Sequence, residues 1–415
     1  MRKSIVLYKI IEQTKLNGRM IKMAASFNNL PSRIGTKSFK WDKSLEFFGR
    51  EDVIPLWVAD MDFPCAKEIS DALIERAKHP VYGYTVREDG YISAFLDWMR
   101  RRHELVAERE WLTFSPPGII YAIWQLIQIM TEPGDGIIVP TPDYASFYDV
   151  VNGTGRKLIY SPMIMSDKGE YALNIEHIEE QVKNGAKAFI FSSPNNPTGR
   201  VFHRTELEPL LRLSEKYGLL ILSDEIYADF VFSGNKHLPI HTVLPSANDK
   251  VVALYAVNKC FNLGGLQMST VIIPSDELRK KYNEAMYTAQ TRLDNVFGTI
   301  AFEQAYKYGE EWLEQTIEYV AGNRVLVEDM LRSIPEIKVC PAESSFLMWL
   351  DCRSLGLDLC GLKDFFMNKA GLAPTFGDEF GPLGDGFVRI NIACSKTLLE
   401  QAMVQLLEAI KSLNK

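Results

Sequence analysis

The chain has no apolar run that could cross a membrane. None of its 415 residues lies in a stretch near the roughly 18 consecutive apolar residues that a spanning helix needs. The first 22 residues begin with a basic pair, and their longest apolar run, Ile5–Tyr8, is too short for the core of a secretion signal. We therefore expect a cytoplasmic protein without membrane contact, in which residues 1–27 form an N-terminal arm that can be disordered.

Cysteine pairs, histidines and basic runs are also scarce. The six cysteines are scattered without a Cys-x-x-Cys pair, which favours reduced thiols over a disulfide framework or a zinc site. None of the six histidines lies in a motif described below, and no Gly-x-Ser-x-Gly elbow is present, so a serine hydrolase and a histidine-ligated metal enzyme are disfavoured. The net charge of −7 and the absence of any basic run longer than Arg100–Arg102 argue against nucleic-acid binding.

What the sequence does contain is a clear β-α-β pattern in its middle. Ala188–Ser192 is a short apolar run, typical of a strand that is covered on both faces. A helix follows, for which Thr205 and Glu208 match a capping box and Gly218 marks the end. The next apolar run, Leu219–Leu222, is a second strand. The two strands should be parallel and joined by a right-handed connection.

Further strands and helical stripes extend this pattern along the chain. Apolar strands are predicted at 137–139, 251–256 and 271–273, and Ile69, Leu73 and Ala77 mark a helical face. Alternation of this kind predicts an α/β fold with three layers, α/β/α, over residues 65–300. Residues 301–415 are more helical and predict a smaller α+β domain, which the N-terminal segment 28–64 joins.

Three polar residues follow consecutive predicted strands in the order amide, acid, amine. Asn196 lies in Asn-Pro-Thr-Gly, Asp224 ends an apolar strand, and Lys259 follows the run Val251–Ala256. Ligands of such sheets bind beyond the carboxyl ends of the strands, where all three fall. Each residue alone has an ordinary explanation, as a turn asparagine, a capping aspartate or a surface lysine. Together they indicate a site for an aldehyde cofactor with a basic ring nitrogen.

With these motifs the chain resembles the fold-type I pyridoxal-phosphate enzymes, the aminotransferase class I/II superfamily. The resemblance covers nearly the whole chain from about residue 28. It rests on four motifs in the expected order, namely Asn-Pro-Thr-Gly (196–199), Asp-Glu-Ile-Tyr (224–227), Asn-Lys-x-Phe-Asn-x-x-Gly-Leu (258–266) and Arg-Ile-Asn-Ile-Ala (389–393). It implies a large cofactor-binding domain of the aspartate-aminotransferase type with a smaller domain beside it.

Within that superfamily the chain is most similar to the cystathionine β-lyase, or C–S lyase, branch. The segments that carry this narrower resemblance are Leu-Trp-Val-Ala-Asp-Met-Asp-Phe (56–63), Tyr-Gly-Tyr (82–84), Ser-Pro-Pro-Gly-Ile (115–119) and Pro-Asp-Tyr-Ala-Ser-Phe (142–147). Asp60 and Asp62 in the first segment could also suggest a metal site, although two alternate carboxylates are weak support for one.

The resemblance implies a role for each site residue. Lys259 would bind the cofactor covalently and act as acid and base, and Asp224 would pair with the pyridinium nitrogen. The remaining expected positions are Asn196 and Tyr227 at the phenolic oxygen, Tyr144 on the ring, Gly118 and Ile119 at the phosphate, Arg389 at the substrate carboxylate, and Tyr84 in the active site of a neighbouring subunit. A homodimer with its site at the interface is therefore expected, with a small amino acid as substrate.

Three positions depart from the aminotransferase pattern around the lysine. That pattern has Ser-x-Ser-Lys before the attachment point and an arginine eight residues after it, whereas this chain has Ala256, Asn258 and Gln267. The phosphate therefore lacks an expected cation and one or two hydroxyls. Gln267 favours the lyase branch, and Asn258 would either donate an amide hydrogen to the phosphate or weaken cofactor binding.

Three functions follow, in descending order of preference. The first is a pyridoxal-phosphate C–S β-lyase that cleaves cystathionine or cysteine S-conjugates to a thiol, pyruvate and ammonia. The second is a pyridoxal-phosphate aminotransferase, which uses the same groups for a different outcome. The third is a regulatory binding protein on this enzyme scaffold, with a protein partner, for which the altered positions around Lys259 are the motive.

Overall fold

The computed structural model describes residue 27 and residues 30–413. The expected N-terminal arm therefore lies outside the described residues, apart from Phe27, which is buried. Within the described part of the chain, no helix combines the length and the apolar character needed to cross a bilayer.

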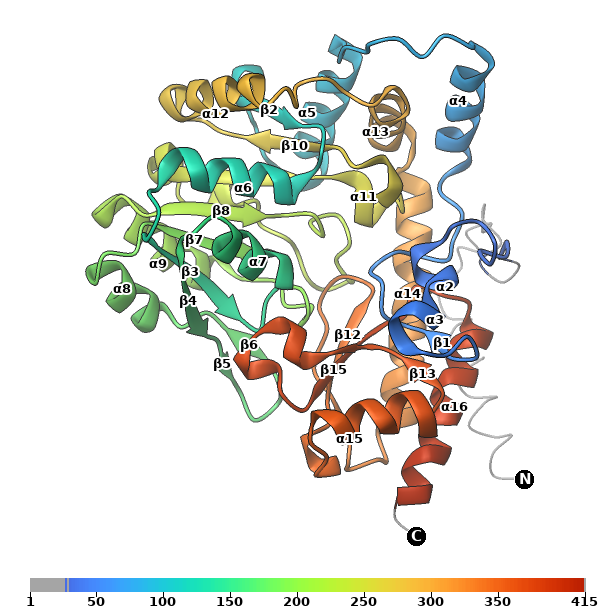
Figure 1. Ribbon diagram of the computed structural model, residues 1–415. Helices are drawn as coiled ribbons and strands as arrows, with labels where there is room; N and C mark the ends of the chain where they lie inside the picture. Colours follow the sequence, from blue (N-terminus) through green and yellow to red (C-terminus); the bar gives the residue numbers. More distant parts are fainter. Residues whose placement is uncertain (1–26, 28–29, 414–415) are drawn as a thin grey trace.

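A seven-stranded sheet forms the centre of the larger part of the molecule (Figure 1). Its strands β7, β8, β9, β3 and β4 are parallel, and only β10 runs antiparallel to its neighbours. The five-residue strands β7, β8 and β9 are buried along their whole length, as expected for strands covered on both faces. The order across the sheet is β2 (Leu112–Ser115), β10 (Ser269–Ile272), β9 (Val251–Tyr255), β8 (Leu220–Asp224), β7 (Ala188–Ser192), β3 (Gly136–Thr141) and β4 (Lys157–Pro162).

The direction of the strand order reverses between β3 and β7. From β3 the chain passes through α7 (Ala145–Gly153) to β4 on one side, whereas from β7 it passes through α9 (Arg204–Tyr217) to β8 on the other. Right-handed connections in opposite directions place α7 and α9 on opposite faces of the sheet. The predicted α/β/α layers are confirmed, and the reversal marks the crevice where ligands of such sheets bind.

Further helices complete the two outer layers. Helices α6, α7 and α12 lie side by side, and α8 packs beside α9, while α4 and α5 pack against α13 (Figure 1). Their bounds are α4 (Lys67–Lys78), α5 (Asp89–His103), α6 (Ile119–Met130), α8 (Ile175–Lys183), α12 (Asp276–Thr288) and α13 (Val296–Tyr308). The helical stripe predicted from Ile69, Leu73 and Ala77 therefore lies in α4.

The start of α9 differs from the prediction. The helix begins at Arg204, so His203 is the N-cap residue and Glu206, rather than Glu208, is the third helical position. The backbone N–H of His203 donates to Glu206 Oε2 at 2.9 Å. The capping box predicted from Thr205 and Glu208 therefore lies two residues after the box that forms, which consists of His203 and Glu206. Gly218 ends the helix in the left-handed conformation, as predicted.

A second sheet of four antiparallel strands lies beside the first. Its order is β11 (Lys338–Val339), β12 (Leu347–Asp351), β15 (Phe387–Asn391) and β14 (Thr375–Phe376). Helices α14 (Glu310–Leu331) and α16 (Lys396–Leu413) pack together in this part. The smaller elements are α10 (Ile240–Val243), α11 (Val257–Cys260), α15 (Leu359–Asp364) and the two-stranded pair β5 (Ile164–Met165) and β6 (Tyr171–Ala172).

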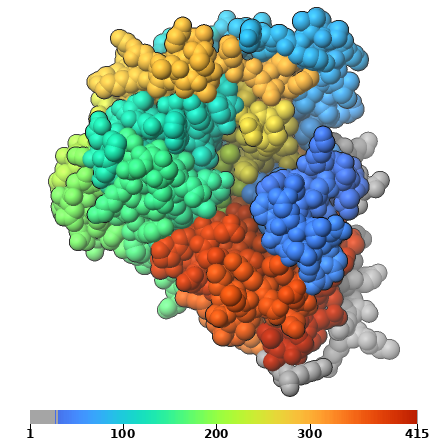
Figure 2. Space-filling view, in the orientation of Figure 1, coloured from blue at the N-terminus to red at the C-terminus, as the bar shows by residue number. Residues whose placement is uncertain are grey.

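The N-terminal segment packs against the C-terminal part of the chain. Strand β1 (Ile54–Pro55) pairs in parallel with β13 (Leu372–Ala373). Two short helices precede it, α2 (Phe39–Asp42) and α3 (Ser44–Phe48). Figure 2 shows this segment, in blue, against the orange and red C-terminal residues.

Candidate active site

Several of the predicted residues lie at one edge of the large sheet. Gly118 follows β2, Tyr144 follows β3, Asn196 follows β7, Asp224 ends β8, and Lys259 lies in α11 directly after β9. These strands run in the same direction, so their carboxyl ends meet at one edge. All five residues line one cavity of about 450 Å³, together with Ile119, Tyr227 and Arg389.

Lys259 has an environment that favours the neutral amine. Its Nζ donates to the backbone oxygen of Ala59 at 2.7 Å. Burial is the main cause that lowers the pKa of this amine to about 8, and the charge of Arg389 lowers it further, while Asp60 and Asp224 oppose both. A lysine with such a pKa is a better nucleophile and base near neutral pH than an exposed one.

Asp224 is a buried carboxyl at the base of the cavity. Burial raises its pKa to about 7, against the opposing effects of the Ile226 backbone N–H, at 3.1 Å from Oδ1, and of the charge on Lys259. A carboxyl held near neutrality by burial gains a great deal from a cationic partner. Its position suits the protonated nitrogen of a pyridine ring.

Arg389 extends into the cavity from β15 of the second sheet, so both sheets contribute to the site. Its Nη1 donates to Asn196 Oδ1 at 3.0 Å, and its Nη2 donates to the backbone oxygen of Trp57 at 2.7 Å and to Thr375 Oγ1 at 2.9 Å. Burial lowers the pKa of this guanidinium. The hydrogen bonds hold the planar group in a fixed orientation, as bidentate binding of a carboxylate requires.

Three buried polar atoms on residues that line this cavity lack a hydrogen-bond partner among the described residues. They are the hydroxyl of Tyr227, Oδ1 of Asn258 and Nε of Arg389. Because a buried polar atom without a partner is costly, these atoms indicate a polar ligand. The phenolic oxygen of pyridoxal phosphate suits the hydroxyl of Tyr227. Its phosphate suits the backbone N–H of Ile119 at the start of α6, whereas the N–H of Gly118 already donates to the backbone oxygen of Ser115 at 2.9 Å.

The three unusual positions differ in how they relate to the cavity. Asn258 and Gln267 line it, whereas Ala256 does not. Gln267 has a left-handed backbone conformation, with φ of 44°. The cationic side chains on the cavity wall are those of Lys259 and Arg389. The wall near Gly118 therefore presents side-chain amides and backbone N–H groups, without a positive charge, to a phosphate.

Tyr84 is the one predicted residue that lies outside this cavity. Its side chain is 93% exposed, and the neighbouring Val81 and Tyr82 are exposed as well. The fold of one chain thus leaves Tyr84 at the surface, and its predicted role needs a second subunit.

Other cavity residues were not predicted from the sequence. Trp57 and Ala59 lie inside the motif 56–63 but act through their backbone oxygens, which no motif marks. Thr375 accepts a hydrogen bond from Arg389. Phe39, Glu379 and Phe380 also line the cavity, and they come from segments without a recognisable signal.

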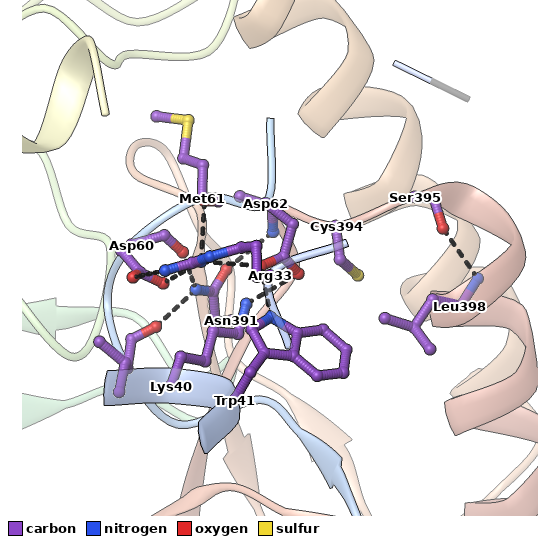
Figure 3. A network of polar contacts seen from close by, with 12 residues as sticks. Arg33, Lys40, Trp41, Asp60, Met61, Asp62, Asn391, Cys394, Ser395 and Leu398 are labelled. Carbon is purple, nitrogen blue, oxygen red and sulfur yellow. Dashed lines mark hydrogen bonds and ion pairs between the residues drawn. The ribbon is translucent and has the colours of Figure 1, made fainter. Parts of the chain in front are cut away.

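A buried ion-pair network holds the segment 57–62 in place (Figure 3). Arg33 pairs with both Asp60 and Asp62, at 2.5 and 2.9 Å. Lys40, which is fully buried, pairs with Asp62 at 3.0 Å, and the indole N–H of Trp41 donates to the same carboxylate at 2.9 Å. Both carboxylates are thus neutralised by cations. The described residues contain no cluster of three or more potential metal ligands.

Two asparagines fix the backbone of the same segment. Asn391 donates through Nδ2 to the backbone oxygens of Val58 and Asp60, at 2.6 Å each. Asn262 donates to the backbone oxygens of Met61 and Phe63 at 3.0 and 2.7 Å. Through these contacts the Lys259 loop and β15 both position the oxygen of Ala59 that accepts from Lys259.

Comparisons with known proteins identify the family of this chain. The family model described as aminotransferase class I and II matches residues 51–406. Cystathionine β-lyase PatB of Bacillus subtilis is 35% identical over 387 residues, which cover 93% of this chain and 100% of PatB. Protein MalY of Escherichia coli is 29% identical over a match that covers 93% of this chain and 99% of MalY.

Solved structures give the same result. A pyridoxal-phosphate-bound putative aminotransferase from Clostridium difficile has a TM-score of 0.91 and 35% sequence identity. The match covers 93% of this chain and 100% of the aminotransferase chain. A pyridoxal-phosphate-bound C–S lyase from Staphylococcus hominis has a TM-score of 0.87 and 28% sequence identity. The match covers 92% of this chain and 97% of the lyase chain.

Proposed function

Because this chain belongs to the aminotransferase class I and II family, we propose that it is a pyridoxal-phosphate-dependent carbon–sulfur β-lyase. The observation that carries the proposal is the convergence of Lys259, Asp224 and Arg389 on one cavity. The substrates are cystathionine or other cysteine S-conjugates, and the products are a thiol, pyruvate and ammonia.

The cofactor supplies an electron sink that stabilises negative charge at Cα of the amino acid. Asp224 holds the proton on the ring nitrogen, because a buried carboxylate beside a cation is favoured over the neutral acid. The hydroxyl of Tyr227 faces the same cavity and is free to donate to the phenolic oxygen. Each of these contacts favours the electron-poor form of the ring.

Lys259 moves the proton at the reacting carbon. Its amine, with a pKa lowered to about 8, removes the proton from Cα of the bound amino acid. Arg389 binds the α-carboxylate of the substrate through two N–H groups and so presents the Cα–H bond to the amine. Loss of the Cα proton then allows the Cβ–S bond to break, and the sulfur leaves as a thiol.

We propose β-elimination rather than transamination because of the names of the related proteins. PatB is named a cystathionine β-lyase, and the structural neighbour from Staphylococcus hominis is named a C–S lyase. An aminotransferase would use the same three side chains, so the cavity alone does not separate the two reactions. Gln267 in place of an arginine agrees with the lyase branch.

The test is to assay the purified protein with pyridoxal phosphate and a series of S-substituted L-cysteines. We expect stoichiometric thiol and pyruvate from each cleaved substrate. Conversion of the cofactor to its pyridoxamine form, reversed by a keto acid and without pyruvate, would establish an aminotransferase instead.

We further propose that the enzyme is a cytoplasmic homodimer in which Tyr84 enters the partner's cavity. The exposure of Tyr84, with Val81 and Tyr82 beside it, supports an interface at this surface. The six free cysteines suit a reducing compartment.

Sedimentation should give twice the mass of the chain. Mixed dimers of Tyr84→Phe and Lys259→Ala chains should keep one wild-type site.

A further inference from the structure

An aromatic cluster, formed by Phe39, Phe47, Phe48 and Trp57, lies at the mouth of the cavity. Phe39 and Trp57 line the cavity itself. The ring centroids of Phe39, Phe47 and Trp57 are 4.9–5.2 Å apart, and Phe48 packs edge-on against Trp57 at 5.1 Å. Phe39 and Phe47 are 52% and 51% exposed. The cluster therefore continues the cavity wall outward as an exposed apolar surface.

Polar contacts of the two residues that follow Phe39 hold the cluster in place. Lys40 and Trp41 both donate to the Asp62 carboxylate, at 3.0 and 2.9 Å (Figure 3). The indole N–H of Trp57 donates to the backbone oxygen of Lys40 at 3.1 Å. Helix α2 is thus attached to the same segment that contacts Lys259 and Arg389. The Phe39 ring has a defined place relative to the reacting groups.

The charges on the cavity wall are distributed unevenly. Its cations are Lys259 and Arg389, and both have a role at the amino-acid end of the substrate. The wall also contains Glu379, an exposed residue that adds a negative charge. An isolated second carboxylate on the substrate, such as that of S-carboxymethyl-L-cysteine, finds no further cation there and is repelled by Glu379.

From these contacts we propose that the aromatic cluster binds the sulfur substituent and selects cysteine conjugates whose substituent is aromatic or aliphatic and carries no net negative charge. The inference rests on the proposed lyase function and specifies its substrate class. Such a substituent packs against Phe39 and Trp57 after Arg389 has bound the α-carboxylate. It leaves as its thiol when the Cβ–S bond breaks, and the thiolate takes up a proton.

The experiment measures kcat/KM of the holoenzyme for three substrates: S-benzyl-L-cysteine, S-methyl-L-cysteine and S-carboxymethyl-L-cysteine. We expect S-benzyl-L-cysteine to exceed S-carboxymethyl-L-cysteine by about tenfold or more. Phe39→Ala should lower kcat/KM for S-benzyl-L-cysteine by about 3- to 10-fold, the usual effect of one aromatic contact, and leave S-methyl-L-cysteine unchanged. Phe39→Leu should restore part of the loss.

Two further variants separate packing from charge. Glu379→Gln should raise kcat/KM for S-carboxymethyl-L-cysteine severalfold and change the value for S-benzyl-L-cysteine much less. Leu45→Ala is the matched control, since Leu45 is an exposed apolar residue of α3 that does not line the cavity, and it should change none of the three values.

The possible results are distinct. A preference for S-carboxymethyl-L-cysteine in the wild type, or an equal loss for all three substrates in Phe39→Ala, would overturn the substrate class while the lyase function stands. No pyruvate from any of the three substrates would instead refute the lyase function itself.

Discussion

The inner wall of the cavity and its mouth are built in different ways. The inner wall consists of polar side chains that the two sheets position. Asp224 is buried at the end of β8, Lys259 is half-buried after β9, and Arg389 is buried in the middle of β15. The mouth consists of partly exposed aromatic rings on the short helices α2 and α3 and on the segment that includes Trp57. The comparison suggests that the sheets fix the chemistry, whereas the N-terminal segment fixes which substituent enters.

The largest expected effect comes from removing the amine of the inner wall. Lys259→Ala should lower kcat by at least about 10³-fold, because both cofactor attachment and proton transfer depend on it. The visible absorbance of the bound cofactor should disappear while the circular dichroism spectrum is unchanged. Lys250→Ala, at the other end of β9 and exposed, is the control and should keep full activity.

Asp224→Ala should have the next largest effect. The variant should still bind the cofactor through Lys259 but lose about 100-fold in kcat, since the ring nitrogen no longer has a charged partner. Absorbance titration measures the binding, and pyruvate release measures the turnover. Full activity in this variant would remove Asp224 from the mechanism.

Arg389→Lys should mainly raise KM, by about tenfold, with a smaller loss in kcat. A lysine keeps the charge but cannot donate two parallel hydrogen bonds to a carboxylate. Steady-state kinetics with S-methyl-L-cysteine separates the two constants. A loss confined to kcat would show that Arg389 acts on the reacting atoms rather than on the carboxylate.

The network that supports the mouth should matter for stability. Asp62→Ala leaves the buried Lys40 without its carboxylate partner and should cost about 3 kcal/mol in the free energy of unfolding. Urea titration measures this cost. Asp71→Ala, which removes the exposed pair between Lys67 and Asp71, should produce no measurable change.

The smallest effect concerns pH. Because the neutral amine is the nucleophile and the pKa of Lys259 is about 8, attachment of pyridoxal phosphate to the apo-protein should speed up as pH rises toward 8 and level off above it. An exposed lysine would continue to gain reactivity up to about pH 10. Stopped-flow absorbance between pH 6 and 10 distinguishes the two profiles.

The sequence predicts the inner wall better than the mouth. Apolar runs that end in Asp224 and before Lys259 predict strands and place both side chains at one edge of a sheet, because parallel strands share that edge.

The mouth could not be predicted because its contacts are long-range and carry no motif. Phe39 and Phe47 meet Trp57 only after α2 and α3 fold back on the segment 57–62. The hydrogen bonds of Lys259 and Arg389 to the segment use backbone oxygens of Ala59 and Trp57, which any residue could supply. Prediction from sequence was also inexact at short range, because the capping box of α9 forms two residues before the predicted one.

The central claim is that Lys259 holds the cofactor at a site that performs β-elimination. The most direct test treats the holoenzyme with borohydride, digests it and maps the modified peptide by mass spectrometry, after pyruvate has been assayed on the same sample with S-methyl-L-cysteine. We predict the modification on Lys259 together with pyruvate release. Modification of another lysine, or an unmodified chain that forms no pyruvate, would contradict this account and favour a binding protein on the same scaffold.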